Sequence, residues 1–319
     1  MNLTLHRLNI ALESEHEKVC RLWQTLFQGW VLPTAVQSDL SLHLQFQAAL
    51  PPLPIEPPYF RDTHDLPGEV GILSVYQQEA GYKLLHYLDG ALVSVPPADA
   101  PPVARGVVVE KAMQYGRFED ITFTSLAPLL RQRGYYLVHA FAASKDGQTL
   151  LIIGPSGSGK TTTGLSLLLH GWELLANDIL LLEERNGRIY ALPTPGIVNI
   201  RPRTLELLPA LQPRLASIPP VFGQYNITGE ALVNGRWSAP SPITHLYFPY
   251  IEQRPQTTLH RRNRAVALAS LMSESMDRWD EETMSDHLTI LQKLVRQADA
   301  FELHLGQELE QIPALLQYA

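Results

Sequence analysis

The stretch that decides the fold runs from Leu150 to Thr161 and reads LLIIGPSGSGKT. Four apolar residues typical of a buried strand precede an octapeptide that begins at Gly154 and fully matches the pattern G-x-x-x-x-G-K-[ST]. The residues from Thr162 to His170 then have the composition of a helix. A strand, a glycine-rich turn and a helix in this order predict a loop whose backbone N–H groups converge on phosphate oxygens at a helix N-terminus.

The residue types of this motif predict a nucleotide and a metal ion as ligands. In such a loop Lys160 spans the β and γ phosphates, and Thr161 offers its hydroxyl to Mg²⁺. We therefore expect a nucleotide and Mg²⁺ as cofactors, with ATP as the expected nucleotide of a kinase, while no base-reading motif in the sequence selects ATP over GTP. The predicted nucleotide-binding residues are Gly154, Pro155, Ser156, Gly157, Ser158, Gly159, Lys160, Thr161 and Thr162. The same loop serves GTPases, transporter ATPases and small-molecule kinases, so it predicts the ligand and leaves the reaction open.

Composition excludes several classes of partner and compartment. The 319 residues are 45% hydrophobic and 18% charged, which is typical of a folded globular protein. The net charge of −7 argues against binding to nucleic acid or to an anionic membrane. The single cysteine, Cys20, can form neither an internal disulfide nor a zinc site. Because the chain also lacks a signal-peptide pattern and any window of 18 apolar residues, we expect a cytoplasmic protein.

The length predicts two domains, and we place the boundary between residues 115 and 116. Residues 1–115 are predicted to form a smaller β-rich N-terminal domain, for which acceptor recognition is a candidate role. Residues 116–319 are predicted to form an α/β nucleotide-binding domain. The expected elements are a helix over 14–29 with Ser14 and Glu17 as a capping box, strands over 40–46, 70–77, 82–88 and 91–95, a helix over 121–133, strands over 135–143 and 149–153, a helix over 286–297 and a strand over 300–305.

One carboxylate stands at a short distance from the loop along the chain. Asp178 interrupts the apolar stretch 171–182, 18 residues after Lys160. A helix followed directly by a strand beside the strand of the loop would return Asp178 to the phosphates. There it could hold Mg²⁺ or accept a proton from an attacking hydroxyl. The alternative interpretation is an ordinary aspartate at a turn or strand end.

In this region the chain resembles the kinase domain of HPr kinase/phosphorylase, a family with a phosphoenolpyruvate-carboxykinase-like fold. The resemblance is carried by His139 before the strand of the loop, by the loop itself, by Gly171 and by the pair Asn177-Asp178, with the same lysine-to-aspartate spacing. It covers about 135–205 well and 240–319 loosely. It implies that Asp178 is the proton acceptor toward a substrate hydroxyl, and that His139 and Lys160 also serve catalysis.

The chain departs from the family pattern at two acidic positions. Asn177 stands where the family has the first acidic residue of its pair, and the family's metal-ligating glutamate would fall at Ala191. Magnesium would then depend on Thr161, Asp178, phosphate oxygens and water. The segment needed for the phosphorylase half-reaction has no convincing equivalent, although residues 261–264 lie in roughly the right region, so we expect no phosphorylase activity.

Two groups of arginines are weaker candidates for binding anions. Arg201 and Arg203 could reach a transferring phosphate, or could form a solvated helix start. We interpret the arginines within 261–264 as flanking a helix that begins at Ala265, in preference to a site for an acidic acceptor.

Together, the residues and the resemblance predict a Mg-ATP-dependent kinase that phosphorylates a hydroxyl of a protein, peptide or small-molecule acceptor, with no nucleic acid or membrane as partner. Homo-oligomerisation is a further expectation from the resemblance. Two alternatives stay open at this point. One is a catalytically degenerate nucleotide-binding regulatory protein, consistent with Asn177 and Ala191, and the other is an ATPase coupled to motion or assembly.

Overall fold

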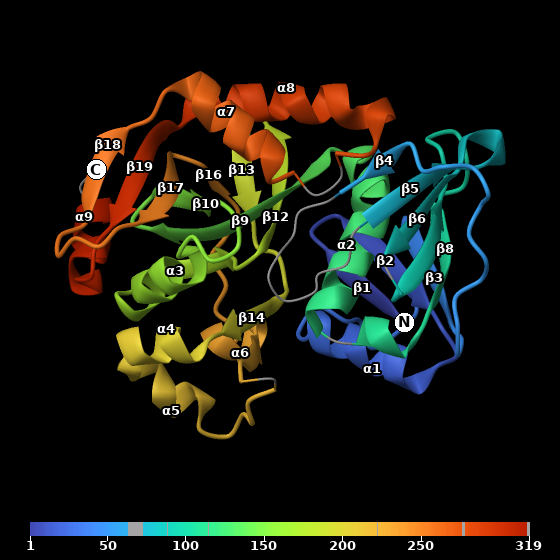
Figure 1. Cartoon of the computed structure of the whole chain (residues 1–319), viewed down its shortest axis with the longest axis horizontal. Helices are drawn as coiled ribbons and strands as arrows, with labels where there is room; N and C mark the ends of the chain where they lie inside the picture. The colour runs from blue at the N-terminus through green and yellow to red at the C-terminus, as the bar shows by residue number, and fades with distance from the viewer. Residues whose placement is uncertain (63–72, 88, 114, 222, 276–277, 318–319) are drawn as a thin grey trace. The chain divides into compact units, whose positions relative to one another are not determined.

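The computed structural model describes residues 1–62, 73–87, 89–113, 115–221, 223–275 and 278–317. It divides into two compact units, Met1–Arg133 with Trp279–Glu281, and Gly134–Arg278 with Glu282–Ala319 (Figure 1). Each unit combines a mixed β-sheet with helices, so the predicted α/β class is what the structure shows. In the part of the chain that is described, no helix has both the length and the apolar composition needed to cross a membrane.

The described residues of the first unit build a sheet with the strand order β1-β2-β3-β8-β7-β6-β5-β4. β3 is parallel to β2 and β8, and the other neighbours are antiparallel. Helices α1 and α2 pack on each other, and α2 also packs on β3 and β7. The bounds are β1 Asn2–Leu5, β2 Leu8–Glu13, α1 Glu17–Leu26, β3 Leu40–Phe46, β4 Phe60–Arg61, β5 Leu73–Gln77, β6 Lys83–Tyr87, β7 Ala91–Val95, β8 Val103–Val108 and α2 Tyr115–Arg131, with 3₁₀ turns at Glu79–Gly81 and Glu110–Met113.

The strands expected from alternation are confirmed as β3, β5, β6 and β7, while residues 70–72 and 88 of two of them lie outside the described residues. The sequence interpretation missed β1, β2, β4 and β8. β1 and β2 form a hairpin whose two-residue turn, His6-Arg7, lacks glycine and places His6 at a positive φ of 58°. Without the usual turn residues this hairpin gave no local signal.

The predicted capping box at Ser14 is wrong. Helix α1 begins at Glu17, and its N-cap is His16, whose side chain makes no capping bond. The Ser14 hydroxyl instead accepts a hydrogen bond from the backbone N–H of His16 at 3.4 Å. Ser14 therefore supports a turn before the helix, a competing use of serine side chains.

The division between the units falls after Arg133, whereas the sequence placed it at 115/116. The difference is helix α2, which packs on the first unit's strands. Arg131 near its end is buried and lies 3.4 Å from Asp280, which also belongs to the first unit. Contacts between residues this far apart in sequence cannot be recognised from a local sequence pattern. The sequence boundary therefore placed this helix in the second domain, whereas it belongs to the first unit.

The second unit contains a larger mixed sheet with the order β16-β13-β12-β9-β10-β17-β19-β18, and β11 also pairs with β9. β10, β17 and β19 are parallel, and the other pairs are antiparallel. The strand bounds are β9 Tyr135–Lys145, β10 Gln148–Ile153, β11 Glu173–Ala176, β12 Ile179–Arg185, β13 Arg188–Leu192, β16 Ser241–Pro242, β17 His245–Ile251, β18 Thr258–Arg261 and β19 Asp299–Leu305. A separate pair consists of β14 Ile197–Ile200 and β15 Tyr225–Thr228.

Helices cover both faces of this sheet (Figure 1). α7 and α8 lie on one face and share a core with alternate residues of β9 and β12, such as Val138 and Leu180. α3 lies on the opposite face, where Phe141 and Leu165 are fully buried. The helix bounds are α3 Lys160–Leu169, α4 Pro202–Leu207, α5 Gln212–Leu215, α6 Gly229–Val233, α7 Arg264–Ser273, α8 Glu281–Gln297 and α9 Ile312–Gln317, with 3₁₀ turns at Pro209–Leu211 and Leu309–Gln311.

The segments nearest the motif follow the sequence prediction closely. The two predicted strands are confirmed as β9 and β10, which form a hairpin whose turn residues Asp146 and Gly147 both have positive φ, 51° and 80°, as a type I′ turn requires. The predicted C-terminal helix and strand are confirmed as α8 and β19. These elements carry strong local signals, which explains the agreement.

Candidate active site

The octapeptide forms a tight connection between β10 and α3. Residues Gly154–Gly159, called the glycine loop below, leave the sheet after Ile153, and α3 begins at Lys160. Gly157 and Gly159 have φ of 82° and 102°, a backbone region that favours glycine. A Cβ added at Gly159 would also lie 2.6 Å from Leu305 Cδ1. The positive φ therefore favours glycine at this position, and a side chain there would also have to displace the end of the Leu305 side chain.

A close contact with the sheet fixes where the N-terminus of α3 lies. A Cβ at Gly164 would lie 2.3 Å from the ring of Phe141, so only glycine lets the helix approach β9 this closely. The N-terminus of α3 thereby stays at the carboxyl end of β10. That is the geometry in which helix N–H groups and the helix dipole favour an anion.

Lys160 lies in the turn of the glycine loop. Its residue is 5% exposed, and Nζ donates to the carbonyl oxygens of Gly154 and, at 3.2 Å, of Pro155. Burial lowers the pKa of the Lys160 ammonium, and the positive charge of Arg201 acts in the same direction, against the carboxylate of Asp178. An anionic ligand beside Lys160 would stabilise its charged form against both burial and the repulsion from Arg201.

His139 and Asp178 form the polar pair of the site. His139 Nε2 lies 2.9 Å from Asp178 Oδ1, and their side chains are 29% and 38% exposed. Burial alone would lower the pKa of His139, but the Asp178 carboxylate outweighs it and raises the pKa above the ordinary 6.5. Burial opposes ionisation of Asp178, yet His139 and then Lys160 hold the pKa of its carboxyl at about 2. The two side chains together form a charged, hydrogen-bonded pair in reach of solvent.

The strand geometry that produces this pair differs from the expected one. β11 and β12 both pair with β9, so the chain that carries Asp178 runs beside β9 and is separated from β10 by it. The register places Ile179 opposite His139, and the irregular residues Asn177 and Asp178 fall between the two strands. The backbone N–H of Ala140 also donates to the carbonyl of Asp178 at 2.9 Å. His139 lies on β9, which pairs with β10, and therefore stands between the loop strand and Asp178.

Asn177 and Ala191, where the HPr kinase pattern has acidic residues, cannot supply the site with a second carboxylate. Asn177 is buried, and its Nδ2 donates to the carbonyl of Ile197 at 3.3 Å, while its Oδ1 has no hydrogen-bond partner. Ala191 is fully buried in the apolar core beside β12 and pairs with Leu182. Neither residue presents a charged oxygen to the site.

The donor set tests whether a magnesium ion fits this site. No group of three or more His, Cys, Asp or Glu side chains suited to a metal occurs among the described residues. Asp178 supplies one carboxylate, and Thr161, half-buried in the first turn of α3, supplies one hydroxyl. Mg²⁺ is commonly held by one or two carboxylates together with substrate phosphates and waters, so this sparse oxygen set fits it.

The remaining hydroxyls of the motif have different surroundings. Thr162 Oγ1 lies 2.9 Å from Thr204 Oγ1 and so ties the first turn of α3 to α4. Ser158 Oγ is buried and has no hydrogen-bond partner. Pro155, Ser156 and Gly157 form the exposed crest of the glycine loop.

Arg201 and Arg203, the two arginines proposed to reach a phosphate, have different surroundings in the structure. Arg203 pairs with Glu206 at 2.8 Å on the surface of α4, which matches the solvated-helix interpretation. Arg201 is the N-cap residue of α4, is exposed, and acts electrostatically on Lys160. It lies one turn before Thr204, which contacts Thr162. Of the two, Arg201 is the one near the glycine loop.

The arginines that precede α7 make ion pairs and packing contacts with neighbouring strands and helices of the second unit. Arg261 lies 3.2 Å from Asp299, and Arg262 is almost fully buried, donates to Ser270 at 2.8 Å and stacks over Phe248 at 4.2 Å. The next residue, Asn263, caps α7 by accepting from the N–H of Ala265. These contacts agree with the interpretation of this segment as a helix flank.

Glu274 is a residue of the site that the sequence interpretation missed. Its backbone carbonyl accepts from the N–H of His139 at 2.8 Å, and its charge raises the pKa of both His139 and Lys160. It caps the C-terminus of α7, more than a hundred residues further along the chain. No local pattern marks it, because its role depends only on where α7 packs.

Comparisons with known proteins add little to this geometry. No family model and no curated protein matches the chain. Among solved structures it is similar to the HPr(Ser) kinase/phosphatase from Coxiella burnetii, with 13% sequence identity and a TM-score of 0.31 over 57% of this chain and 94% of that chain. At that level the likeness places the chain in no family, so function rests on the residues of the site.

Proposed function

We propose that the second unit is a Mg-ATP-dependent kinase of the HPr-serine-kinase type, which transfers the γ-phosphoryl group to a hydroxyl of a protein, peptide or small molecule and has no phosphorylase activity. The observation that carries the proposal is the 2.9 Å contact between His139 and Asp178 together with the buried Lys160 of the glycine loop, whose ammonium helps to lower the pKa of the Asp178 carboxyl. In this arrangement the buried Lys160 ammonium would bind the phosphates, and the Asp178 carboxylate would receive the acceptor hydroxyl. Phosphoryl transfer needs little more than such positioning and charge stabilisation.

Each side chain has a separate task in this mechanism. N–H groups of the glycine loop and Lys160 hold the γ-phosphoryl group, and Asp178 accepts a hydrogen bond from the acceptor hydroxyl. As the bond from that oxygen to phosphorus forms and the bond to ADP breaks, the hydroxyl proton passes to Asp178. A carboxyl with a pKa of about 2 is a weak base, so this transfer comes late, after bonding to phosphorus has acidified the hydroxyl.

His139 and the metal ion complete the arrangement. His139 holds the Asp178 carboxylate in place through the 2.9 Å contact, and its positive charge adds to that of Lys160. Thr161 and Asp178 are the residues that would hold Mg²⁺. When bound, Mg²⁺ neutralises charge on the phosphate oxygens.

The direct test measures nucleotide turnover against acceptor. We expect Mg²⁺-dependent ATP binding by calorimetry, and ADP formation that is stimulated by a hydroxyl acceptor and accompanied by its phosphorylation, followed by mass spectrometry with serine peptides and cell metabolites. Steady phosphate release without acceptor would instead identify an ATPase. The absence of any nucleotide binding would refute the proposal.

A second candidate is a nucleotide-binding regulatory protein without turnover. It is favoured by the burial of Ala191 in the apolar core and by the engagement of Asn177 with a backbone carbonyl, because both remove carboxylates that the resemblance would lead one to expect. ATP binding of normal strength with no transfer to any acceptor would support this candidate over the kinase.

Arg201 and Arg203 offer a matched test of where the transferred group lies. We expect Arg201→Gln to slow single-turnover transfer by about 100-fold, since an arginine near the transferred phosphoryl group contributes strongly to transition-state stabilisation. Arg203→Gln should leave the rate unchanged, because Arg203 pairs with Glu206 on the surface. Equal rates for wild type and both variants would exclude Arg201 from the site.

A further inference from the structure

The edge of the sheet that carries the glycine loop also carries the ends of two other strands. β10, β17 and β19 are parallel, so their carboxyl ends meet at one edge. The glycine loop leaves β10 there, β17 ends at Ile251 and β19 ends at Leu305. In open α/β sheets, ligands bind outside the carboxyl ends of the strands.

The glycine loop rests directly on these two ends. A Cβ added at Gly159 would lie 2.6 Å from Leu305 Cδ1 and 3.8 Å from Ile251 Cγ1, and one added at Gly154 would lie 3.6 Å from Pro249 Cδ. Ile251 is nevertheless 67% exposed. An exposed isoleucine beside a phosphate-binding loop is apolar surface that a bound ligand could cover.

The catalytic side chains indicate the direction in which a nucleotide would extend. His139 and Asp178 lie on β9 and at the start of β12, on one side of β10, whereas β17 and β19 lie on the other side. A nucleotide whose γ-phosphate faces Lys160 and Asp178 therefore extends its nucleoside away from them. The surface at the carboxyl edge on that side of β10 is formed by the ends of β17 and β19.

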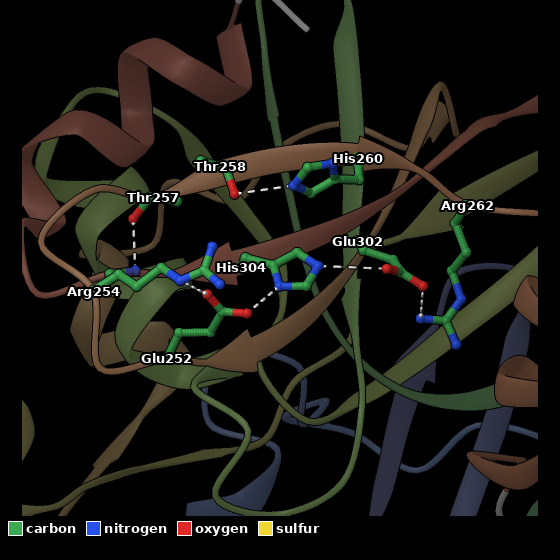
Figure 2. Close-up of polar contacts among 9 residues, drawn as sticks. Glu252, Arg254, Thr257, Thr258, His260, Arg262, Glu302 and His304 are labelled. Atoms are coloured by element: carbon green, nitrogen blue, oxygen red, sulfur yellow. Dashed lines mark hydrogen bonds and ion pairs between the residues drawn. The ribbon is translucent and has the colours of Figure 1, made fainter.

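The segment that follows Ile251 is held rigidly by polar contacts (Figure 2). The Glu252 carboxylate contacts His304 Nδ1 at 2.6 Å and Arg254 Nε at 3.2 Å. The Glu252 N–H donates to the carbonyl of Leu305 at 2.9 Å, and the hydroxyl of Thr257 accepts from the next backbone N–H, that of residue 306, at 3.0 Å. Ile251 therefore lies at a strand end that these contacts anchor to the end of β19. An anchored surface reduces the entropic cost of binding a ligand.

We propose that Ile251, at the carboxyl end of β17, forms part of a nucleoside-binding surface, and that the base and ribose of the nucleotide pack on its side chain while the phosphates occupy the glycine loop. This inference rests on the proposed nucleotide-dependent function. An isoleucine side chain has no donor or acceptor with which to distinguish purines. The surface should therefore accept adenine and guanine nucleosides alike.

Comparison of a nucleotide with its phosphate chain alone tests the inference. Calorimetry in Mg²⁺ would use ATP, GTP and inorganic tripolyphosphate with wild type, Ile251→Ala and the control Val266→Ala, which trims a 48% exposed residue on α7. In wild type we expect ATP and GTP to bind with similar affinity, at least tenfold more tightly than tripolyphosphate. Ile251→Ala should reduce that ratio by about fivefold and leave tripolyphosphate affinity unchanged, whereas Val266→Ala should preserve the ratio.

The outcomes separate this inference from the proposed function. An unchanged ratio in Ile251→Ala, or equal binding of ATP and tripolyphosphate in wild type, would overturn the nucleoside surface while tripolyphosphate binding still supported a phosphate site in the glycine loop. If neither ATP nor tripolyphosphate bound, both proposals would fail. Because Ile251 is exposed, its truncation should leave the melting temperature unchanged, and a lowered one would contradict the exposure on which the inference depends.

Discussion

We expect Lys160→Ala to abolish phosphoryl transfer, with a rate at least about 1000-fold below that of the wild type. Lys160 is the buried cation of the glycine loop, and its Nζ lies in the turn where phosphate oxygens would converge. Removing it leaves the loop N–H groups but no charge to stabilise the γ-phosphoryl group as it moves. The measurement is the single-turnover transfer rate at saturating ATP, together with ATP affinity by calorimetry.

Two further variants separate loss of charge from loss of structure. Lys160→Met keeps most of the side-chain volume in the buried position, and we expect the same loss of transfer with a melting temperature close to that of the wild type. Lys145→Ala is the matched lysine control, because Lys145 lies at the end of β9 and bonds only the carbonyl of His170 among the described residues. Transfer by Lys160→Met at more than a tenth of the wild-type rate would remove Lys160 from the mechanism.

The part of the site that could be predicted from sequence is the part encoded locally. The strand, glycine loop and helix around Lys160 are contiguous, and each has its own signal in apolar runs and glycines. The positive φ angles at Gly157 and Gly159 are the physical reason for the glycine pattern. His139 was singled out only through the family resemblance, since a histidine in an apolar strand is unremarkable by itself.

What the sequence could not show is how strands far apart in the chain pair. Asp178 was expected on a strand beside β10, but that strand pairs with β9, and this pairing is what brings Asp178 against His139. The hydrogen bond from the His139 N–H to the carbonyl of Glu274 likewise depends on the packing of α7. Register and helix packing are decided by burial across the whole sheet, so a local pattern does not determine them.

We expect Asp178→Asn to bind ATP and to transfer phosphate about 10²- to 10⁴-fold more slowly than the wild type, since an amide cannot take the hydroxyl proton. Asparagine has nearly the same shape as aspartate, so the strand connection should be preserved. The measurements are ATP affinity by calorimetry and the acceptor-dependent transfer rate. ATP binding that weakens only in the presence of Mg²⁺ would assign Asp178 to the metal as well.

The same variant predicts a shift in the titration of His139, which serves as an independent check on the pair. In the wild type the Asp178 carboxylate raises the pKa of His139 above 6.5 against the effect of burial. With the carboxylate gone, burial and Lys160 act to lower it against the smaller effect of Glu274, so the midpoint of the imidazole signal in NMR should fall below 6.5. Asp146→Asn, in the exposed turn between β9 and β10, is the matched control and should leave both the midpoint and the rate unchanged. A fall in the midpoint with full transfer retained would mean that the pair exists but that Asp178 receives no proton, and the acceptor hydroxyl would then lose its proton directly to phosphate or water.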